Sequence, residues 1–289
     1  MGPVPQSVDE LVALLDLEEI ESNLFRGRQP ATALQRVFGG QVAGQALVAA
    51  VRTVDRDRTV HSLHAYFLRP GDIATPIVYD VERTRDGRSF STRRVVARQH
   101  GQPIFYSSVS FQVPEEGLAH QDPMPQTPPP EECPELGDLL ARLTSRPREH
   151  WDREWAALDV RYAGDSREGG ALQDPDHPAM ARVWLRAAGR LPDDPALHTA
   201  LLTYASDLTL LAATLVPHGL LIGDPRLQPA SLDHAMWFHR PFRADEWLLY
   251  DQVSPSASGG RGLATGRLFS ADGRLVVSVV QEGVIRVVG

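Results

Sequence analysis

The sequence predicts an α+β protein made of two tandem units, each an antiparallel sheet wrapped around a long central helix. Three observations support this prediction. Strand-forming stretches follow one another with only turns between them, each run of strands is preceded by a nearly apolar helical stretch, and the two halves match at an almost constant offset. A chain of 289 residues is long enough for one large domain or two of about 140 residues.

The first half begins with helical stretches and continues as strands. Residues 8–17 form a short amphipathic pattern, and residues 38–51 open with Gly39 and Gly40 and then become nearly apolar all round. Aromatic and β-branched residues then alternate over four stretches, with turn signals at Asp86-Gly87 and His100-Gly101. The four expected strands are residues 61–68, 77–83, 88–99 and 103–113.

The composition changes after residue 113. Residues 114–150 are rich in Pro, Glu, Asp and Gln and contain one short helical segment, LGDLLARL. We therefore expect a first unit over residues 1–113, a Pro-rich linker over 114–150, and a second unit over 151–289.

The second half contains the most apolar helical stretch, from Pro195 to Gly219. Asp193 and Asp194 offer caps at its start, Pro195 suits the first helical position, and Gly219 suits the left-handed residue after the end. We therefore expect one long buried helix. The strands expected around it are residues 155–162, 181–187, 230–239, 247–254, 262–269 and 275–286.

The two halves match in several places. AYFLRP at residues 65–70 matches MWFHRP at 236–241 with an offset of 171, and the His100-Gly101 turn matches Asp272-Gly273 with an offset of 172. Each of these turns is followed by an apolar strand that reaches a glutamine, Gln112 or Gln281. Gly39 falls near Asp207 with an offset of 168. An internal duplication explains these matches, and because the copies differ at Gly39 and Asp207, we expect one site per chain.

Asp207 is the residue that draws attention within the long helical stretch. Its helical neighbours three, four and seven residues away include no basic residue. An unpaired carboxylate in apolar surroundings is costly and tends to have a raised pKa, which makes it a candidate acid or base. The alternative is that the helix breaks near Ser206 and Asp207 caps a second helix. The sequence leaves both interpretations open.

Composition excludes several classes of function. The net charge is −8 and no basic block is interleaved with aromatic residues, so nucleic acid is not an expected partner. All 29 basic residues are Arg, which excludes lysine chemistry. His61 and His64, and likewise His234 and His239, lie an odd number of residues apart on expected strands. Each pair should then face opposite ways, so no metal site is expected.

Targeting signals and redox chemistry are also not indicated. The single Cys133 lies in a Pro-rich acidic stretch, so neither an intrachain disulfide nor a catalytic thiol is expected. The first residues lack a basic region followed by an apolar run, and no apolar span of 18 residues occurs. The expectation is a soluble cytoplasmic protein without a membrane span.

The blocks of sequence, taken in order, resemble the acyl-CoA thioesterase II (TesB-type) family. The blocks that carry the resemblance are LFRGRQP, RVFGGQVAGQAL, HAYFLRPGD, DVERTRDGRSFSTRRVVA, YASDLTLL, LDHAMWFHRPF, EWLLYD, SASGGRG and VVQEGVIR. They cover nearly the whole chain except residues 114–150. The resemblance implies a double hot-dog fold, in which each half is a sheet wrapped around a long helix, and hydrolysis of acyl-CoA without a cofactor.

The resemblance also implies three site residues. In the family an Asp, a hydroxyl residue and a Gln hold the catalytic water, which corresponds here to Asp207, Ser231 and Gln281. The family usually has Thr where this chain has Ser231, so the hydroxyl is retained on a side chain with freer rotamers. An acidic general base is consistent with thioester hydrolysis, in which water must lose a proton as it attacks the carbonyl carbon.

Other groups are expected to contact the substrate. A helix that begins near Gly39 and Gly40 presents free amides, so we expect these to donate to the oxyanion, or else only to allow close helix packing. Arg93 and Arg261 occupy comparable places in the two copies and are candidates for the phosphates of coenzyme A, the alternative being solvated surface arginines.

Two other functions stay open at this point. A hydratase or dehydratase on acyl thioesters would pair an acidic residue with a nearby His on the same helix, but the next His after Asp207 is His218, three turns away. A non-catalytic acyl-CoA-binding module is the other possibility. The lack of a G-x-S-x-G motif disfavours a serine hydrolase. Exposed sheet edges favour a homo-oligomer.

Overall fold

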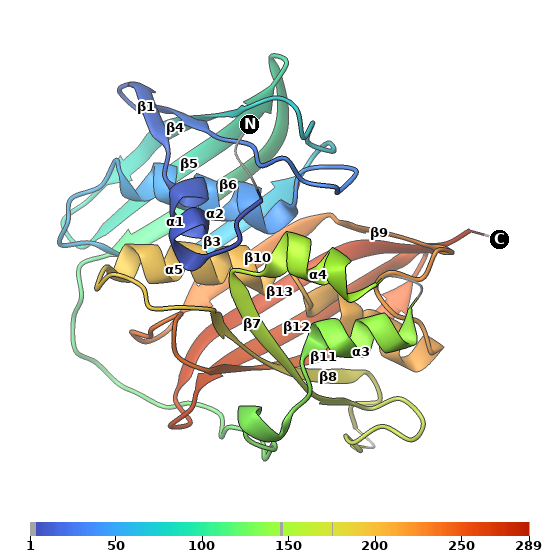
Figure 1. The fold of residues 1–289 in the computed structure, drawn as a ribbon. Coiled ribbons are helices and arrows are strands. Elements are labelled where there is room, and N and C mark those ends of the chain that lie inside the picture. The colour runs from blue at the N-terminus through green and yellow to red at the C-terminus, as the bar shows by residue number, and fades with distance from the viewer. Residues whose placement is uncertain (1–3, 145–146, 175, 289) are drawn as a thin grey trace.

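A computed structural model describes residues 4–144, 147–174 and 176–288 of the chain. Within these residues one large antiparallel sheet runs through both halves, in the order β1-β2-β4-β5-β6-β3-β10-β13-β12-β11-β8-β7, and β9 pairs with β13. In Figure 1 the blue and green N-terminal strands form the upper part and the orange and red C-terminal strands the lower part. The strands are β1 (Glu18–Glu21), β2 (Leu24–Gly27), β3 (Thr59–Phe67), β4 (Ile77–Asp86), β5 (Phe90–Gln99), β6 (Gln102–Gln112), β7 (Leu158–Asp165), β8 (Met180–Ala187), β9 (Leu227–Ser231), β10 (Asp233–Phe238), β11 (Leu248–Ser258), β12 (Arg261–Ser270) and β13 (Leu275–Val287).

The two halves are related by a pseudo-twofold axis at the centre of this sheet. β3 and β10 pair in an antiparallel manner, and His64 lies opposite Ala235. The difference, 235 − 64 = 171, is the offset that the sequence repeats predict, so this pair is its own counterpart. The strand order on the two sides of it is the same when read outwards. The fold is therefore the double hot-dog that the sequence predicts.

Each half of the sheet carries its own central helical segment. α2 (Gly39–Val51) packs on the N-terminal strands, whereas the 3₁₀-helix η2 (Leu210–His218) packs on β8, β11, β12 and β13. α5 (Pro195–Ser206) precedes η2 and packs against α2, as the two central helices in Figure 1 show. The approach is close because a methyl group at Gly40 would lie 2.2 Å from the carbonyl oxygen of Tyr204.

The predicted long helix over 195–219 is wrong in one respect. The α-helix ends at Ser206, and the chain continues in the tighter 3₁₀ form up to His218. Hydroxyl groups of Thr203 and Ser206 donate to backbone carbonyls of the preceding turn, which competes with regular helix geometry. The ends agree with the prediction, since Asp194 caps the start and Gly219 is left-handed with φ of 63°.

The expectation that no apolar span of 18 residues occurs is wrong, because the stretch Pro195–His218 has the length and hydropathy of a membrane span. It is the only such helical stretch within the described part of the chain, and 78% of its most apolar window is buried inside the protein. Its apolar residues therefore serve the core.

The Pro-rich middle of the chain is packed rather than free. Figure 1 shows the pale green segment after β6 running down the outside of the molecule to the C-terminal half. There Arg240 and Arg182 donate to the carbonyls of His120 and Gln126, and the Trp184 indole donates to the carbonyl of Pro128. The segment LGDLLARL is α3 (Leu136–Leu143), as predicted.

Two details of the element assignment differ from the sequence prediction. Trp155 ends a helix, α4 (Arg148–Trp155), and the following strand starts only at Leu158. α1 (Val8–Leu15) and β1 have the same spacing as α4 and β7. We therefore propose that the second unit begins with α4 rather than at residue 151. The short strands β1 and β2 were not predicted, because β1 is exposed and acidic.

Candidate active site

Asp207 lies directly after the last turn of α5, where α5 gives way to η2. It is the C-terminal cap residue of α5, and the residue before η2 is Thr209, which makes no side-chain cap. The chain does break near Ser206, but the Asp207 side chain does not cap the second helix. It points to the N-terminus of α2 and to two side chains of the C-terminal sheet.

Three side chains meet at this point. The Ser231 hydroxyl donates to Oδ1 of Asp207 at 3.1 Å, and the Gln281 amide nitrogen donates to the same oxygen at 2.5 Å. The Gln281 nitrogen also lies 2.9 Å from Ser231 Oγ, to which it donates. The structure thus brings together all three residues that the resemblance implies, although 24 and 50 residues separate them in the chain.

The environment of Asp207 favours a carboxylate that titrates near neutrality. Burial raises the pKa of Asp207 to about 6, against the lowering effect of donors from Gln281, Ser231 and the Gly40 amide and of the Arg36 charge. The N-terminus of α2 faces the carboxylate, and its dipole also favours negative charge. Such a group is mostly ionised at pH 7 to 8 and can still accept a proton.

A break between two strands sets the position of Ser231. β9 ends at Ser231 and β10 starts at Asp233, with Leu232 between them outside both strands. The Asp233 carboxylate accepts from the backbone N–H of Glu282 at 2.6 Å, which fixes this break to β13 beside Gln281. Regular strand alternation would point Ser231 and His234 to opposite faces. Because of the break, both face the end of α5.

Only the second copy has these polar groups. The strand pairings relate Ser231 to Val60 with an offset of 171, and Gln281 to Val109 with an offset of 172. The sequence match paired Gln281 with Gln112, but the register of the strands shows that Val109 is its counterpart. The helix starts, Gly39 for α2 and Leu210 for η2, also differ by 171, so Asp207 lies three residues before the counterpart of Gly39 and corresponds to Arg36. Val60, Val109 and Arg36 carry no acid, hydroxyl or amide side chain, so this triad occurs once.

Gly39 and Gly40 border the carboxylate. A methyl group at Gly39 would lie 2.7 Å from Oδ2 of Asp207, so only glycine leaves room for the acidic side chain. The Gly40 N–H donates to Asp207. The glycines thus permit close packing of α2 on α5, and at least one of their amides is directed at the site.

The Gln281 carbonyl oxygen is available to a further molecule. Gln281 is completely buried, and its Oε1 has no hydrogen-bond partner among the described residues. A buried acceptor without a partner is costly, so a bound water or substrate donor would relieve it. Asp207 itself retains some accessible surface.

Two surface hollows lie away from this site. One, of about 340 Å³, includes Asp174 and Asp251 in its lining, and the other, of about 620 Å³, includes Trp151 and Arg186. Neither is lined by any of the three triad residues. Among the residues that the structure describes, no group of three or more His, Cys, Asp or Glu side chains is placed to hold a metal ion.

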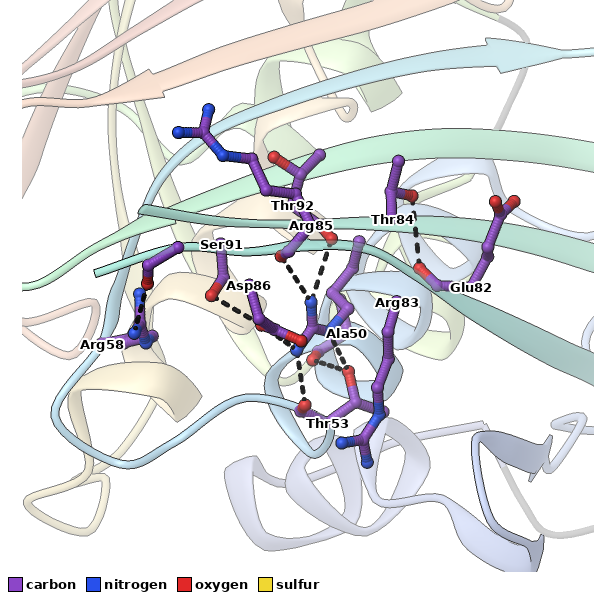
Figure 2. Close-up of polar contacts among 12 residues, drawn as sticks. Ala50, Thr53, Arg58, Glu82, Arg83, Thr84, Arg85, Asp86, Ser91 and Thr92 are labelled. Atoms are coloured by element: carbon purple, nitrogen blue, oxygen red, sulfur yellow. Dashed lines mark hydrogen bonds and ion pairs between the residues drawn. The ribbon is translucent and has the colours of Figure 1, made fainter. Parts of the chain in front are cut away.

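Arg93 does not lie on the surface, so it cannot meet coenzyme A phosphates. Its side chain is only 2% exposed and donates to the backbone carbonyls of Thr53, Arg85 and Thr92. It also donates to Thr53 Oγ1 at 2.9 Å and to Asp86 at 2.7 Å. Figure 2 shows these partners gathered where β4 and β5 pass the end of α2. Arg93 is a structural residue that joins that end to the sheet.

Arg93 and Arg261 are also not counterparts. The register of β5 and β12 relates Arg93 to Ala264 with an offset of 171. Arg261 is exposed and forms an ion pair with Glu282 at 2.9 Å. Of the two arginines, only Arg261 is therefore accessible to solvent and ligands.

Two buried residues next to the site were missed in the sequence. His234 is fully buried, and its Nε2 lies 2.8 Å from the hydroxyl of Ser206, the residue before Asp207. The Tyr250 hydroxyl donates to the backbone carbonyl of Ser206 at 3.2 Å. The difference between copies gives a sequence signal for His234, because its counterpart at an offset of 171 is the apolar Leu63.

The fold and the site together define a double hot-dog protein with one buried acid, hydroxyl and amide cluster per chain. Comparison with known proteins supports this class. The model of the acyl-CoA thioesterase N-terminal domain matches residues 27–112, and the acyl-CoA thioesterase model matches residues 171–284. Together these two regions cover most of the strands of both halves, although β1 and β7 lie outside them.

Individual relatives match over nearly the full length. Acyl-CoA thioesterase 2 of Haemophilus influenzae is 39% identical, covering 96% of this chain and 98% of that protein. Human acyl-coenzyme A thioesterase 8 is 42% identical over 96% of this chain and 89% of its own. The crystal structure of the acyl-CoA thioesterase II TesB2 of Mycobacterium marinum has a TM-score of 0.81 at 49% identity, covering 97% and 98%. The chain belongs to the acyl-CoA thioesterase family and is a thioester hydrolase.

Proposed function

We propose that the chain hydrolyses fatty or related acyl-CoA to the free acid and coenzyme A by attack of a water molecule held by Asp207, Ser231 and Gln281. The observation that carries this proposal is the convergence of the Ser231 hydroxyl and the Gln281 amide on one oxygen of a carboxylate with a raised pKa. The unpaired Oε1 of Gln281 offers an additional acceptor for the water.

In this reaction Asp207 acts as the general base. It takes a proton from water as the water oxygen bonds to the thioester carbonyl carbon, and the carbonyl oxygen becomes an oxyanion. When the tetrahedral intermediate collapses, the carbon–sulfur bond breaks and the thiolate of coenzyme A receives the proton. General base catalysis of this type contributes typically about 10² to 10⁴ in rate.

The amides at the start of α2 are the proposed oxyanion donors. Gly39 and Gly40 lie beside Asp207, and glycine lets a substrate approach the backbone closely. Because the Gly40 N–H already donates to Asp207, a substrate oxyanion would compete with the carboxylate for it. The proton transfer to Asp207 weakens that bond at the moment when the oxyanion forms.

A hydratase would need a histidine beside the acidic residue, and no histidine among the described residues bonds Asp207. His218 is exposed at the end of η2, and the buried His234 bonds Ser206 rather than Asp207. A thiol-release assay distinguishes the alternatives, because a hydratase or a binding module releases no free coenzyme A.

The test of the proposal is Asp207→Asn. We expect its turnover to fall by about 10² or more while acyl-CoA still binds. The matched control is Asp251→Asn, which alters a buried carboxylate that accepts from Arg182 and Arg267 away from the site, and it should retain turnover. Near-normal thiol release by Asp207→Asn would refute the role of the base.

We further propose that the chain forms a homo-oligomer. Tyr66 is 51% exposed on β3 and stacks with Tyr106 at a ring distance of 5.5 Å, and Leu68 is 44% exposed. Aromatic and aliphatic groups of this size on one exposed strand region favour association. Light scattering of the purified protein tests this directly, and a monomeric mass at all concentrations would contradict it.

A further inference from the structure

The peptide group that joins Ser206 to Asp207 is held from the C-terminal sheet. The Tyr250 hydroxyl donates at 3.2 Å to the Ser206 carbonyl, which belongs to that peptide group. Tyr250 lies on β11, and its exposed fraction is 0%. Together with the φ of Asp207, −80°, the orientation of this peptide plane sets the direction of the Asp207 Cα–Cβ bond. The hydrogen bond from Tyr250 therefore helps to set the direction of the Asp207 side chain.

The same residue is held a second time through its side chain. His234 on β10 lies 2.8 Å from Ser206 Oγ through Nε2, and Ser206 Oγ lies 3.0 Å from the carbonyl oxygen of Thr203. Because the Ser206 hydroxyl donates to the Thr203 carbonyl, it accepts from His234. The neutral His234 ring therefore carries its proton on Nε2. Burial lowers the pKa of His234 to about 4, so this ring is neutral under ordinary conditions.

The duplication provides a comparison for Tyr250. The registers of β4 with β5 and of β11 with β12 relate Tyr250 to Tyr79 with an offset of 171. Tyr79 is equally buried, at 0% exposure, and also donates to the central helix region, but to the side chain of Gln45 at 2.7 Å. Both copies thus keep a buried tyrosine. Only Tyr250 bonds the peptide that carries the carboxylate.

We propose that Tyr250, assisted by His234, is a positioning residue that orients Asp207 toward Ser231 and Gln281. This inference depends on the function proposed above, in which Asp207 is the base. Where α5 changes to the 3₁₀ form, the helix no longer fixes the backbone by regular hydrogen bonds. The two contacts from β10 and β11 supply that constraint. The Asp207 side chain then reaches groups on β9 and β13.

The experiment compares Tyr250→Phe with Tyr79→Phe. Each substitution removes one buried hydroxyl and keeps the ring, so both should lower the Tm to a similar extent. Only Tyr250→Phe should lower kcat, by about 10- to 100-fold, because a small displacement of a catalytic group is costly in rate. Its KM should change by less than about twofold, since the carboxylate acts in the chemical step.

The pH profile gives a second measurement that loss of stability alone would not alter. In the wild type, donors from Ser231 and Gln281 lower the pKa of Asp207 against the effect of burial. If Tyr250→Phe lets the carboxylate turn away from them, the acidic limb of kcat/KM should move to higher pH. The Arg36 charge and the Gly40 amide, which also act on Asp207, are unchanged by the substitution.

His234→Gln is the second variant, since Gln retains a donor of similar reach. It should keep more activity than His234→Leu, which introduces the residue found at the corresponding position of the first copy, Leu63. Equal kcat values for Tyr250→Phe and Tyr79→Phe, with superimposable pH profiles, would overturn the inference. If Asp207→Asn were also fully active, the proposed function itself would fail. An inactive Asp207→Asn beside a normal Tyr250→Phe would reject the positioning role alone.

Discussion

The Asp207→Asn substitution should make the folded chain more stable above pH 7, although it removes activity. Burial raises the pKa of this carboxyl from 3.8 to about 6. Between these values the native state binds more protons than the unfolded chain, so the contribution of Asp207 to stability falls as the pH rises. The shift of about 2 pKa units corresponds to a cost of about 3 kcal/mol for the ionised native state.

This value is an upper bound on the gain, because part of Asp207 remains accessible and Asn makes imperfect bonds with the same donors. Urea unfolding of both chains at about pH 4.5 and about pH 8 measures it. The advantage of the variant should be larger at the higher pH by about 1 to 2 kcal/mol. Other carboxyl groups occur in both chains and cancel in the difference. An advantage that does not change with pH, or that shrinks as the pH rises, would refute this account of the buried charge.

Substitutions at three further positions test the packing and the chemistry of the site. Ser231→Ala should lower turnover at least about tenfold in the thiol assay, whereas Ser231→Thr should retain it, because the hydroxyl remains on a side chain with fewer rotamers; a similar loss in both would argue against the hydroxyl. Gly40→Ala should lower both the Tm and turnover, since its methyl group would lie 2.2 Å from the Tyr204 carbonyl oxygen; an unchanged Tm would contradict this packing. Arg93→Leu should reduce the free energy of unfolding by about 2 to 4 kcal/mol, because it leaves carbonyls such as that of Thr53 unpaired. The KM of this variant for acyl-CoA should not change. An increase in KM would indicate that Arg93 contributes to substrate binding.

The strands and the duplication could be predicted from the sequence because both depend on local patterns. Alternating aromatic and β-branched residues mark β3, β5 and β6, and the repeated offset of 171 anticipates the register at the centre of the sheet. The residues Asp207, Ser231 and Gln281 were named from a family resemblance. The structure adds that they lie within hydrogen-bond distance of one another.

The remaining features depend on contacts that local patterns do not encode. α4 was missed because its first residues were assigned to the Pro-rich linker and Trp155 to the start of a strand, whereas Trp155 ends a helix and packs on Phe38 at a ring distance of 4.7 Å. Glu154 is buried in the same helix because it accepts from Thr32 and from the backbone of residue 33. Arg93 was expected at the surface because charged residues are usually exposed. It is buried because carbonyls from separate parts of the chain accept its hydrogen bonds.

The contact between Gly39 and Asp207 joins the two halves of the chain. Gly39 begins α2, whereas Asp207 lies three residues before η2 begins at Leu210, so the two residues hold different places in the repeat. The acid of one half thus depends on a residue without a side chain at the helix start of the other half. Because both units lie in one polypeptide, the acid and the glycine that makes room for it occur on one side of the molecule only, and their counterparts, Arg36 and Leu210, are free to serve other roles.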